Sequence, residues 1–314
     1  MKVTCYGPRG SIPAPSRKGF STVEYGGNTS CYYVEAGPFR VVLDSGSGIA
    51  NWGDDMMKTG QVGKNFIMLL SHFHWDHLQG MPFAIPFYIG ANTFHVHGHL
   101  PQSRQTHAHD QQTLQSILAE HQATPHFPVP IGAMPSKRVY CDPPHSPQFS
   151  ESFVYYHQSG DYVRLRSVAE GYQPQSENFI KITTIPLNHP DGCLGYRIEF
   201  MGKVLVYATD TEPFRYDNAQ LTKYGMGADM LIMDGQYTNE QLADGAQSFG
   251  HGTAEACIEQ ATACLARQLK VHHFDPKHDD TKLQLMEVQA LASRAATEYD
   301  GTISFAKEGD VWEL

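Results

Sequence analysis

The chain has 314 residues, of which 41% are hydrophobic and 18% are charged, an ordinary globular mixture that excludes extended disorder. Its formal net charge is −10 with histidine neutral. This charge disfavours non-specific binding to nucleic-acid phosphates, because such binding depends on clustered Lys and Arg. The sequence contains no run of ~18 apolar residues and begins without an apolar signal-peptide core, so we expect no membrane partner.

The 6 cysteines are scattered along the chain, and no pair has the C-x-x-C spacing of zinc or redox motifs. In a chain of this length they indicate buried, reduced thiols rather than a disulfide framework. The sequence therefore predicts a protein of the reducing cytoplasm.

The first seventy residues favour β-strands, with strand-like runs at 32–34 and 40–43 separated by the turn signal Gly37-Pro38. The short apolar run 66–70 predicts a buried strand. Four strong metal-binding side chains follow it directly, and a loop at the carboxyl end of a strand is where open α/β sheets place their chemistry. They are His72, His74, Asp76 and His77, and the alternative is a His-rich surface turn.

The middle of the chain, about 92–175, is rich in Pro, His, Gln and Ser. One helix is predicted there at about 110–121, and neither a Gly-Ser linker nor a repeat marks a boundary. We interpret the chain as a single domain, 1–314, with an insertion at about 92–175.

Three histidines alternate at positions 95, 97 and 99, so on a strand they would share one face. Two interpretations remain for these histidines. They could form a separate metal site, or they could lie on a metal-free strand that lines or borders an active-site cleft. We favour the metal-free strand, because no carboxylate or cysteine accompanies the three rings.

The second half of the chain alternates strand and helix signals. Strands are predicted at 180–185, 196–200, 204–208, 230–233 and near Val271. A helix should begin after Thr253, a good N-cap residue, and another should cover about 282–298. These elements predict an α/β protein in which two packed sheets carry helices outside, a four-layer αββα sandwich.

Three further metal-binding residues follow apolar runs as His72 does. His189 comes after the strand at 180–185, Asp210 after 204–208, and His273 after the run that ends at Val271. One such position would be weak evidence for a metal site. Three of them, together with the cluster at 72–77, indicate that all of these residues share one site. His272 is the alternative to His273, since a slip of one residue moves a side chain to the other face of a strand.

The whole set is similar to the metallo-β-lactamase fold superfamily of metal-dependent hydrolases. The resemblance rests on the H-x-H-x-D-H signature at 72–77 and on segments from Leu43-Asp44-Ser45-Gly46 to His273-Phe274. It implies two adjacent metal ions, the first held by His72, His74 and His189, the second by Asp76, His77 and His273, with Asp210 bridging them. It also implies that Asp44 supports the metal loop from behind, the alternative being a turn-forming aspartate.

The implied chemistry follows from two divalent ions, of which Zn²⁺ is expected, with Mn²⁺ or Fe as alternatives because a bridging aspartate is a hard ligand. The resemblance implies a hydroxide shared by both ions as the nucleophile, because metal binding lowers the pKa of water from about 15.7 to roughly 7. Asp76, a member of the second ligand set, is also expected to be catalytic.

Two segments narrow the range of substrates that the resemblance allows. Residues 207–213, Tyr-Ala-Thr-Asp-Thr-Glu-Pro, resemble the phosphodiesterase branch. Residues 250–253, Gly-His-Gly-Thr, resemble the G-H-S-T element of ribonuclease Z, the tRNA 3′-end endonuclease, and of related cyclic-nucleotide phosphodiesterases, although Gly252 stands where that pattern has Ser. This resemblance implies that His251 is the general acid that protonates the leaving oxygen.

The leading prediction is a phosphodiesterase for a cyclic or other small nucleotide, since the acidic balance and the Lys-poor middle segment disfavour extended nucleic acid. The alternatives are tRNA 3′ processing, a metal-holding binding module, and a thioester or lactone hydrolase in which His251 would be dispensable. A homodimer is expected from the base rate among soluble enzymes.

The role of several other side chains stays open in the sequence. Arg9 could pair with a phosphate, but a solvated loop charge is the preferred interpretation. Four aromatic residues are candidates to stack on a base, although core packing is preferred for each: Phe83, Phe87, Tyr88 and Phe127.

Overall fold

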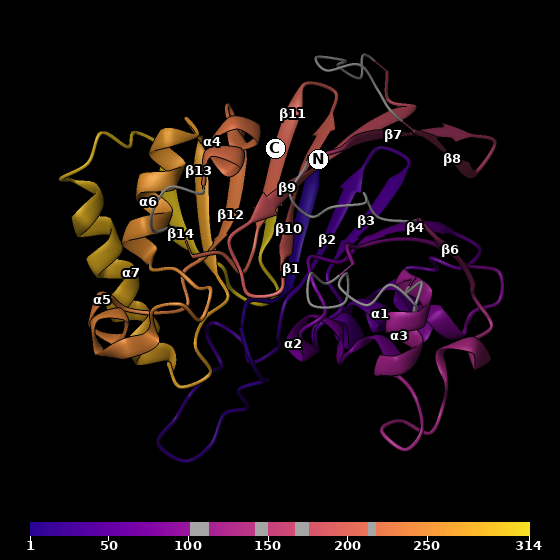
Figure 1. The fold of residues 1–314 in the computed structure, drawn as a ribbon, viewed down its shortest axis with the longest axis horizontal. Coiled ribbons are helices and arrows are strands. Elements are labelled where there is room, and N and C mark those ends of the chain that lie inside the picture. Colours follow the sequence, from indigo (N-terminus) through magenta and orange to yellow (C-terminus); the bar gives the residue numbers. More distant parts are fainter. Residues whose placement is uncertain (101–112, 142–149, 167–175, 213–217) are drawn as a thin grey trace.

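The computed structural model describes residues 1–100, 113–141, 150–166, 176–212 and 218–314. Two β-sheets pack face to face, and helices cover the outer face of each sheet (Figure 1). The predicted αββα sandwich is therefore confirmed. Within the described residues, no helix is both long and apolar enough to cross a membrane.

The first sheet has seven strands in the order β15-β1-β2-β3-β4-β5-β6. Neighbours from β3 to β6 are parallel, whereas β1 is antiparallel to both β2 and β15. The strands are β1 (Lys2–Gly7), β2 (Cys31–Ala36), β3 (Phe39–Leu43), β4 (Asn65–Leu69), β5 (Thr93–His97), β6 (Lys137–Tyr140) and β15 (Val311–Glu313). Its helices are α1 (Ile49–Lys58), α2 (Trp75–Leu78) and α3 (Leu114–His121), with 3₁₀ turns at Met81–Phe83, Ile85–Tyr88 and Ile131–Ala133.

The second sheet has eight strands in the order β14-β13-β12-β11-β10-β9-β7-β8, with β11 to β14 parallel. The strands are β7 (Ser152–Gln158), β8 (Asp161–Arg166), β9 (Phe179–Leu187), β10 (Cys193–Phe200), β11 (Lys203–Ala208), β12 (Met230–Asp234), β13 (Gln268–His272) and β14 (Thr302–Phe305). Its helices are α4 (Ala219–Gly225), α5 (Asn239–Gln241), α6 (Ala254–Ala263) and α7 (Asp280–Arg294), with a π-turn at Leu242–Ala246.

The main core lies between the sheets and is built from alternate residues of their strands, because one face of each strand is turned inward. Tyr32, Val41 and Ile67 of the first sheet meet Ile182 and Tyr196 of the second in one buried cluster. Two further apolar clusters lie beneath the outer helices, one around Trp52 and one around Ile258. Each sheet is therefore covered on both faces, by the other sheet and by helices.

The segment 92–175 contributes to both sheets. Its strands β5 and β6 extend the first sheet, and β7 and β8 form the end of the second. The predicted helix at about 110–121 is present from Leu114, whereas residues 110–112 lie outside the described residues. The division of the chain into a core and an insertion stays a prediction.

The first seventy residues are rich in strands, as expected, and they also contain the helix α1 at Ile49–Lys58, which was not predicted. This helix has only a few buried residues, among them Ile49, Trp52 and Met56, separated by Asn, Gly and Asp that weaken the helical signal. At the other end of the chain, α7 begins at Asp280 behind the N-cap Asp279 and ends at Arg294, earlier than the expected 298.

The strands bring their carboxyl ends to one edge of the sandwich. β9 and β11 run in the same direction because β10 is antiparallel to both, and β12 and β13 are parallel to β11. In the first sheet, β3 and β4 are also parallel neighbours. The loops that carry the predicted ligands therefore leave the two sheets at a common edge.

Candidate metal centre

The structure brings the predicted ligands together in two adjoining groups. In each group one nitrogen or carboxylate oxygen from every member lies within 4.8 Å of all the others. The first group is His72, His74, His189 and Asp210, and the second is Asp76, His77, Asp210 and His273. These are the same sets that the resemblance implies, and Asp210 belongs to both.

Asp210 presents one carboxylate oxygen to each group. Its Oδ2 lies 3.5 Å from Nε2 of His72 and 3.9 Å from Nε2 of His189. Its Oδ1 lies 3.2 Å from Nε2 of His77 and 3.1 Å from Nε2 of His273. This is the arrangement that a carboxylate needs if it is to bind two cations at once.

The donor atoms fit divalent cations. Nε2 of His72 is buried without a hydrogen-bond partner, and Nε2 of His77 and His273 face each other across 3.2 Å. Burial holds the pKa of His72 well below its usual range and that of His189 at about 4, so both rings are neutral, the form that binds a metal. Imidazole with carboxylate suits Zn²⁺, Mn²⁺ or Fe.

Asp44 supports the second group from behind. Its Oδ2 accepts hydrogen bonds from His77 Nδ1 at 2.9 Å, from the Ser71 hydroxyl at 2.9 Å and from the Tyr207 hydroxyl at 2.8 Å. Its Oδ1 accepts from the Ser71 backbone N–H at 2.7 Å. The carboxylate thus fixes the ring of His77 with Nε2 turned toward the second group, which a turn-forming aspartate alone would not do.

Backbone groups position two more of the predicted ligands. His189 Nδ1 donates to the Gly250 carbonyl at 2.9 Å, which leaves Nε2 directed at His74 Nδ1, 3.2 Å away. Asp76 Oδ2 accepts from the Ser11 N–H at 2.7 Å and lies 3.2 Å from His273 Nε2. Asp76 therefore lies where a ligand of the second group should, and its catalytic role stays a prediction.

His251 lies beside both groups at the start of α6. Its ring is stacked on His273 with a 5.0 Å centroid separation and lies 5.2 Å from the ring of His189. Its Nδ1 is 2.8 Å from Oδ2 of Asp234. Burial alone would lower the pKa of His251, but the Asp234 carboxylate overcomes this and raises it to about 9. The Asp234 carboxylate therefore favours the protonated form of the ring.

Asp234 is a site residue that the sequence reasoning missed. It ends β12, directly after the apolar run at 230–233, which is the same signal that identified Asp210 after β11. Besides His251 it accepts from the backbone N–H groups of Thr211 at 3.2 Å and Gln236 at 3.0 Å. The rule that found Asp210, applied to every strand, would have found it.

The preferred interpretation of Arg9 as a solvated loop charge is wrong. The side chain is fully buried, and its guanidinium donates to the backbone carbonyls of Gly26, Asp275 and His278. Burial lowers its pKa to about 10, so it remains charged at neutral pH. Arg9 ties the N-terminal loop to the segment after His273, and its pairing with a phosphate stays a prediction.

His272 and His273 lie in different places. The ring of His272 is buried between the sheets, 5.4 Å from the ring of Tyr32 and 5.5 Å from that of Tyr207. His273 follows with a φ of 64°, in the left-handed region, and joins the second group. The structure therefore places His273, rather than His272, among the predicted ligands.

The three alternating histidines form no metal-binding group within the part of the chain that the structure describes. His97 is stacked on Phe153 at 4.4 Å and its Nε2 lies 2.8 Å from the Tyr155 hydroxyl, inside the sandwich. His95 also packs against Tyr155. His99, beyond the end of β5, lines a cavity beside the metal centre. The metal-free interpretation of the three histidines stays a prediction.

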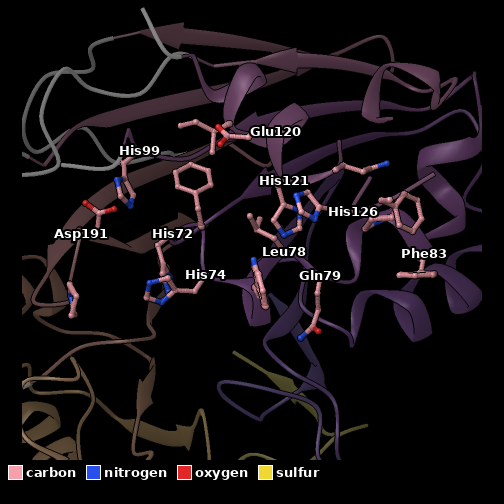
Figure 2. A pocket seen from close by; sticks show the side chains of 18 residues that line it. His72, His74, Leu78, Gln79, Phe83, His99, Glu120, His121, His126 and Asp191 are labelled. Carbon is pink, nitrogen blue, oxygen red and sulfur yellow. The ribbon is translucent and has the colours of Figure 1, made fainter. Parts of the chain in front are cut away.

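That cavity has a volume of about 620 Å³ and opens beside His72 and His74 (Figure 2). Of the four aromatic candidates, Phe83 and Phe127 line it, with their rings edge to face at 5.5 Å. Phe87 is fully buried in the core, as preferred, and the Tyr88 hydroxyl donates to the Pro82 carbonyl.

Comparisons with known proteins bear on the family and the fold of the chain. Residues 128–274 match the family model of the β-lactamase superfamily domain. A segment of 98 residues is 31% identical to ribonuclease Z of Ignicoccus hospitalis, and one of 66 residues is 35% identical to the atrochrysone carboxyl ACP thioesterase of Emericella nidulans. These segments cover 31% and 20% of this chain, and 31% and 21% of the relatives' own lengths, a third or less.

The solved structures show the fold over the whole chain. The metallo-β-lactamase fold protein YhfI of Bacillus subtilis superposes with a TM-score of 0.62 at 19% identity, covering 99% of this chain and 98% of its own. At that identity the likeness establishes the architecture, while the chemistry has to be argued from the side chains.

Proposed function

We propose that this chain, a member of the metallo-β-lactamase superfamily, is a dinuclear-metal hydrolase that cleaves phosphodiester bonds, those of a cyclic or other small nucleotide. The observation that carries the proposal is the pairing of His251 with Asp234 directly beside the two ligand groups, at 2.8 Å. Metal ligands alone would fit many hydrolases, whereas a charged histidine beside them supplies a proton to a departing oxygen.

The two ligand groups would each hold one divalent ion, for which Zn²⁺ is the expected metal. When bound, such ions make water available as a nucleophile near neutral pH and neutralise charge on the phosphate oxygens. The residues of this chain supply the rest. Asp210 would hold the two sites in register, and Asp44 and the Gly250 carbonyl fix the rings of His77 and His189.

His251 matters because of the leaving group. An alkoxide is a poor leaving group that needs a proton as the P–O bond breaks, whereas a thiolate, with a pKa near ~8.5, departs without one. Asp234 fixes Nδ1 of His251 and leaves Nε2 as the atom that donates the proton. A paired, charged histidine therefore favours phosphodiester over thioester cleavage.

The test compares two leaving groups. We expect His251→Gln to lower kcat/KM for 2′,3′-cyclic AMP, whose leaving group is an alkoxide, by about 10²-fold or more. The same variant should lose less than about tenfold on bis(4-nitrophenyl) phosphate, whose aryl leaving group needs little protonation. Equal losses on both substrates would contradict the role of His251 as proton donor.

A panel of cyclic mono- and dinucleotides then identifies the substrate. Hydrolysis of bis(4-nitrophenyl) phosphate without turnover of any nucleotide in the panel would remove the nucleotide from the proposal and leave the phosphodiesterase.

The matched variant Asp229→Asn replaces a buried aspartate that pairs with Arg267 away from the site, and it should retain activity on every substrate.

Two other activities remain candidates, each favoured by one relative. The match to a ribonuclease Z favours tRNA 3′ processing. It would appear as cleavage of precursor tRNA that falls steeply with salt, because many phosphate contacts release counterions. The match to an ACP thioesterase favours thioester hydrolysis, which would survive His251→Gln.

A further inference from the structure

The cavity beside the metal centre is a substrate pocket by its size and position. Its volume of about 620 Å³ lies in the range of small-molecule sites, roughly 300–1,000 Å³. His72 and His74 are part of its wall, so a group bound in the cavity would touch the predicted metal centre. In Figure 2 these two histidines lie toward one side, and Phe83 and His126 lie toward the other.

One wall of the cavity is formed by aromatic side chains, two of which are largely exposed to solvent rather than packed in the core. Phe83 remains 62% exposed and Trp75 77% exposed, although both belong to the lining. Phe83 packs edge to face against Phe127, which comes from a different part of the chain. Large aromatic side chains left open to solvent beside a metal centre indicate a surface for a ligand with a flat apolar face.

The charge of the lining limits what that ligand carries. Among the described residues that line the cavity there is neither Lys nor Arg, while Glu120 and Asp191 both contribute carboxylates. The remaining polar groups include His99, His121 and Gln122, which can hydrogen-bond a neutral heterocycle. A further phosphate or carboxylate on the bound group would therefore meet no Lys or Arg among the described residues of the lining.

The position of His251 relative to the cavity indicates which part of the substrate would enter the cavity. His251 is not among the described residues that line the cavity, and its ring lies against His189 and His273. The proton donor therefore contacts the rings of His189 and His273, whereas the cavity is lined by His72 and His74. With His251 beside the oxygen that leaves, the ester group that stays on phosphorus is the one left to enter the cavity.

We propose that the cavity binds a flat, uncharged ring carried by the ester group that the phosphate retains after cleavage, and that Phe83 and Phe127 form its specificity surface. Water adds to phosphorus, the P–O bond to the leaving group breaks with a proton from His251, and the retained ring stays on the resulting monoester. This inference rests on the proposed function. In a nucleotide the retained ring would be the base.

The experiment uses two diesters that share one leaving group, phenyl 4-nitrophenyl phosphate and methyl 4-nitrophenyl phosphate. Wild-type protein loaded with Zn²⁺ should prefer the phenyl diester. The double variant Phe83→Ala/Phe127→Ala should reduce the ratio of kcat/KM, phenyl over methyl, by about tenfold, a typical loss for one stacking surface. Activity on the methyl diester should stay within about threefold of wild type.

The control is Leu285→Ala, which removes an apolar side chain that is 50% exposed on α7, and it should leave the ratio unchanged. Because Phe83 is largely exposed, the double variant should keep its melting temperature. An unchanged ratio in the folded double variant would overturn the proposal. An equal loss on both diesters would do the same, since the aromatic wall would then position the metal loop and not a ring.

Equilibrium binding separates this inference from the proposed function. Calorimetry with adenosine, a flat neutral probe without phosphate, should show binding to wild type and about tenfold weaker binding to the double variant. If neither diester is cleaved but adenosine binds in this way, the proposed function fails and the subsite stands. If both diesters are cleaved with an unchanged ratio and adenosine does not bind, the subsite fails and the proposed function stands.

Discussion

At the scale of single residues, the site depends on buried polar side chains that each have a fixed orientation. Asp210 divides its two oxygens between the two ligand groups, and Asp44 holds His77 through its Nδ1. The ligand positions were predictable because each follows an apolar strand. The partner of His251 was equally visible in the sequence, as Asp234 after β12, but only the packing shows that the two meet.

Arg9 shows what the sequence could not reveal. An arginine in a glycine-rich loop has the same local pattern whether it binds a phosphate, extends into water or is buried. Its three carbonyl partners come from residues 26, 275 and 278, and the last two lie 266 and 269 residues away in sequence. Only the assembled fold determines its role.

The first prediction concerns Asp44. Asp44→Asn removes the negative charge that orients His77, so the affinity for Zn²⁺ should fall about 10- to 100-fold, the usual cost of losing such a partner. Competition with a chromophoric chelator measures this. Asp229→Asn, a buried aspartate away from the site, should leave the affinity unchanged. An Asp44→Asn protein with wild-type affinity would show that the aspartate only shapes the turn.

The second prediction concerns Arg9. Arg9→Met leaves three backbone carbonyls without their charged donor, so the free energy of unfolding should fall by roughly 3 kcal/mol. Urea denaturation measures this loss, and Arg17→Met, at an exposed position of the same loop region, should change it little. A rise in KM for bis(4-nitrophenyl) phosphate with unchanged stability would instead support Arg9 as a phosphate ligand.

At the scale of elements, the strands were more predictable than the helices and loops. The runs at 66–70, 204–208 and 230–233 became β4, β11 and β12 because continuous apolar residues fit strands buried on both faces. The alternating histidines at 95, 97 and 99 indicated β5, whereas β6 to β8 were not predicted, since their segment is dominated by Pro, His, Gln and Ser. Their pairing at the sheet ends is set by long-range contacts rather than by local pattern.

The third prediction concerns the loop before α6. Gly250 has a φ of 87°, and a Cβ there would lie 2.2 Å from Nδ1 of His189. Gly250→Ala should therefore displace His189, weaken Zn²⁺ binding by at least about tenfold and reduce hydrolysis. The matched control is Gly202→Ala, where φ is 75° but no atom lies within 4 Å of the added carbon.

Gly202→Ala should cost about 1 kcal/mol of stability through its backbone strain and leave metal binding unchanged. Zinc titration and thermal unfolding of the two variants distinguish crowding of the ligand from strain alone. If both variants bound Zn²⁺ equally well, the loop before α6 would have no part in placing His189.

At the scale of the whole molecule, the fold serves to bring loops from two separate sheets to one edge. His72 to His77 come from the first sheet, whereas His189, Asp210 and His273 come from the second. Neither sheet alone holds a complete ligand group. The packing of apolar faces between the sheets thus sets the distance between the two halves of the site, and a sequence can indicate the ligands without fixing that distance.

The most direct measurement of the central claim is the number of Zn²⁺ ions bound per chain, obtained by equilibrium dialysis followed by elemental analysis. Two adjoining groups that share Asp210 predict about two tightly bound ions per wild-type chain, and Asp210→Ala should lose both because it serves each group. A wild-type protein that binds no stoichiometric metal, or an Asp210→Ala variant that retains both ions, would contradict the account.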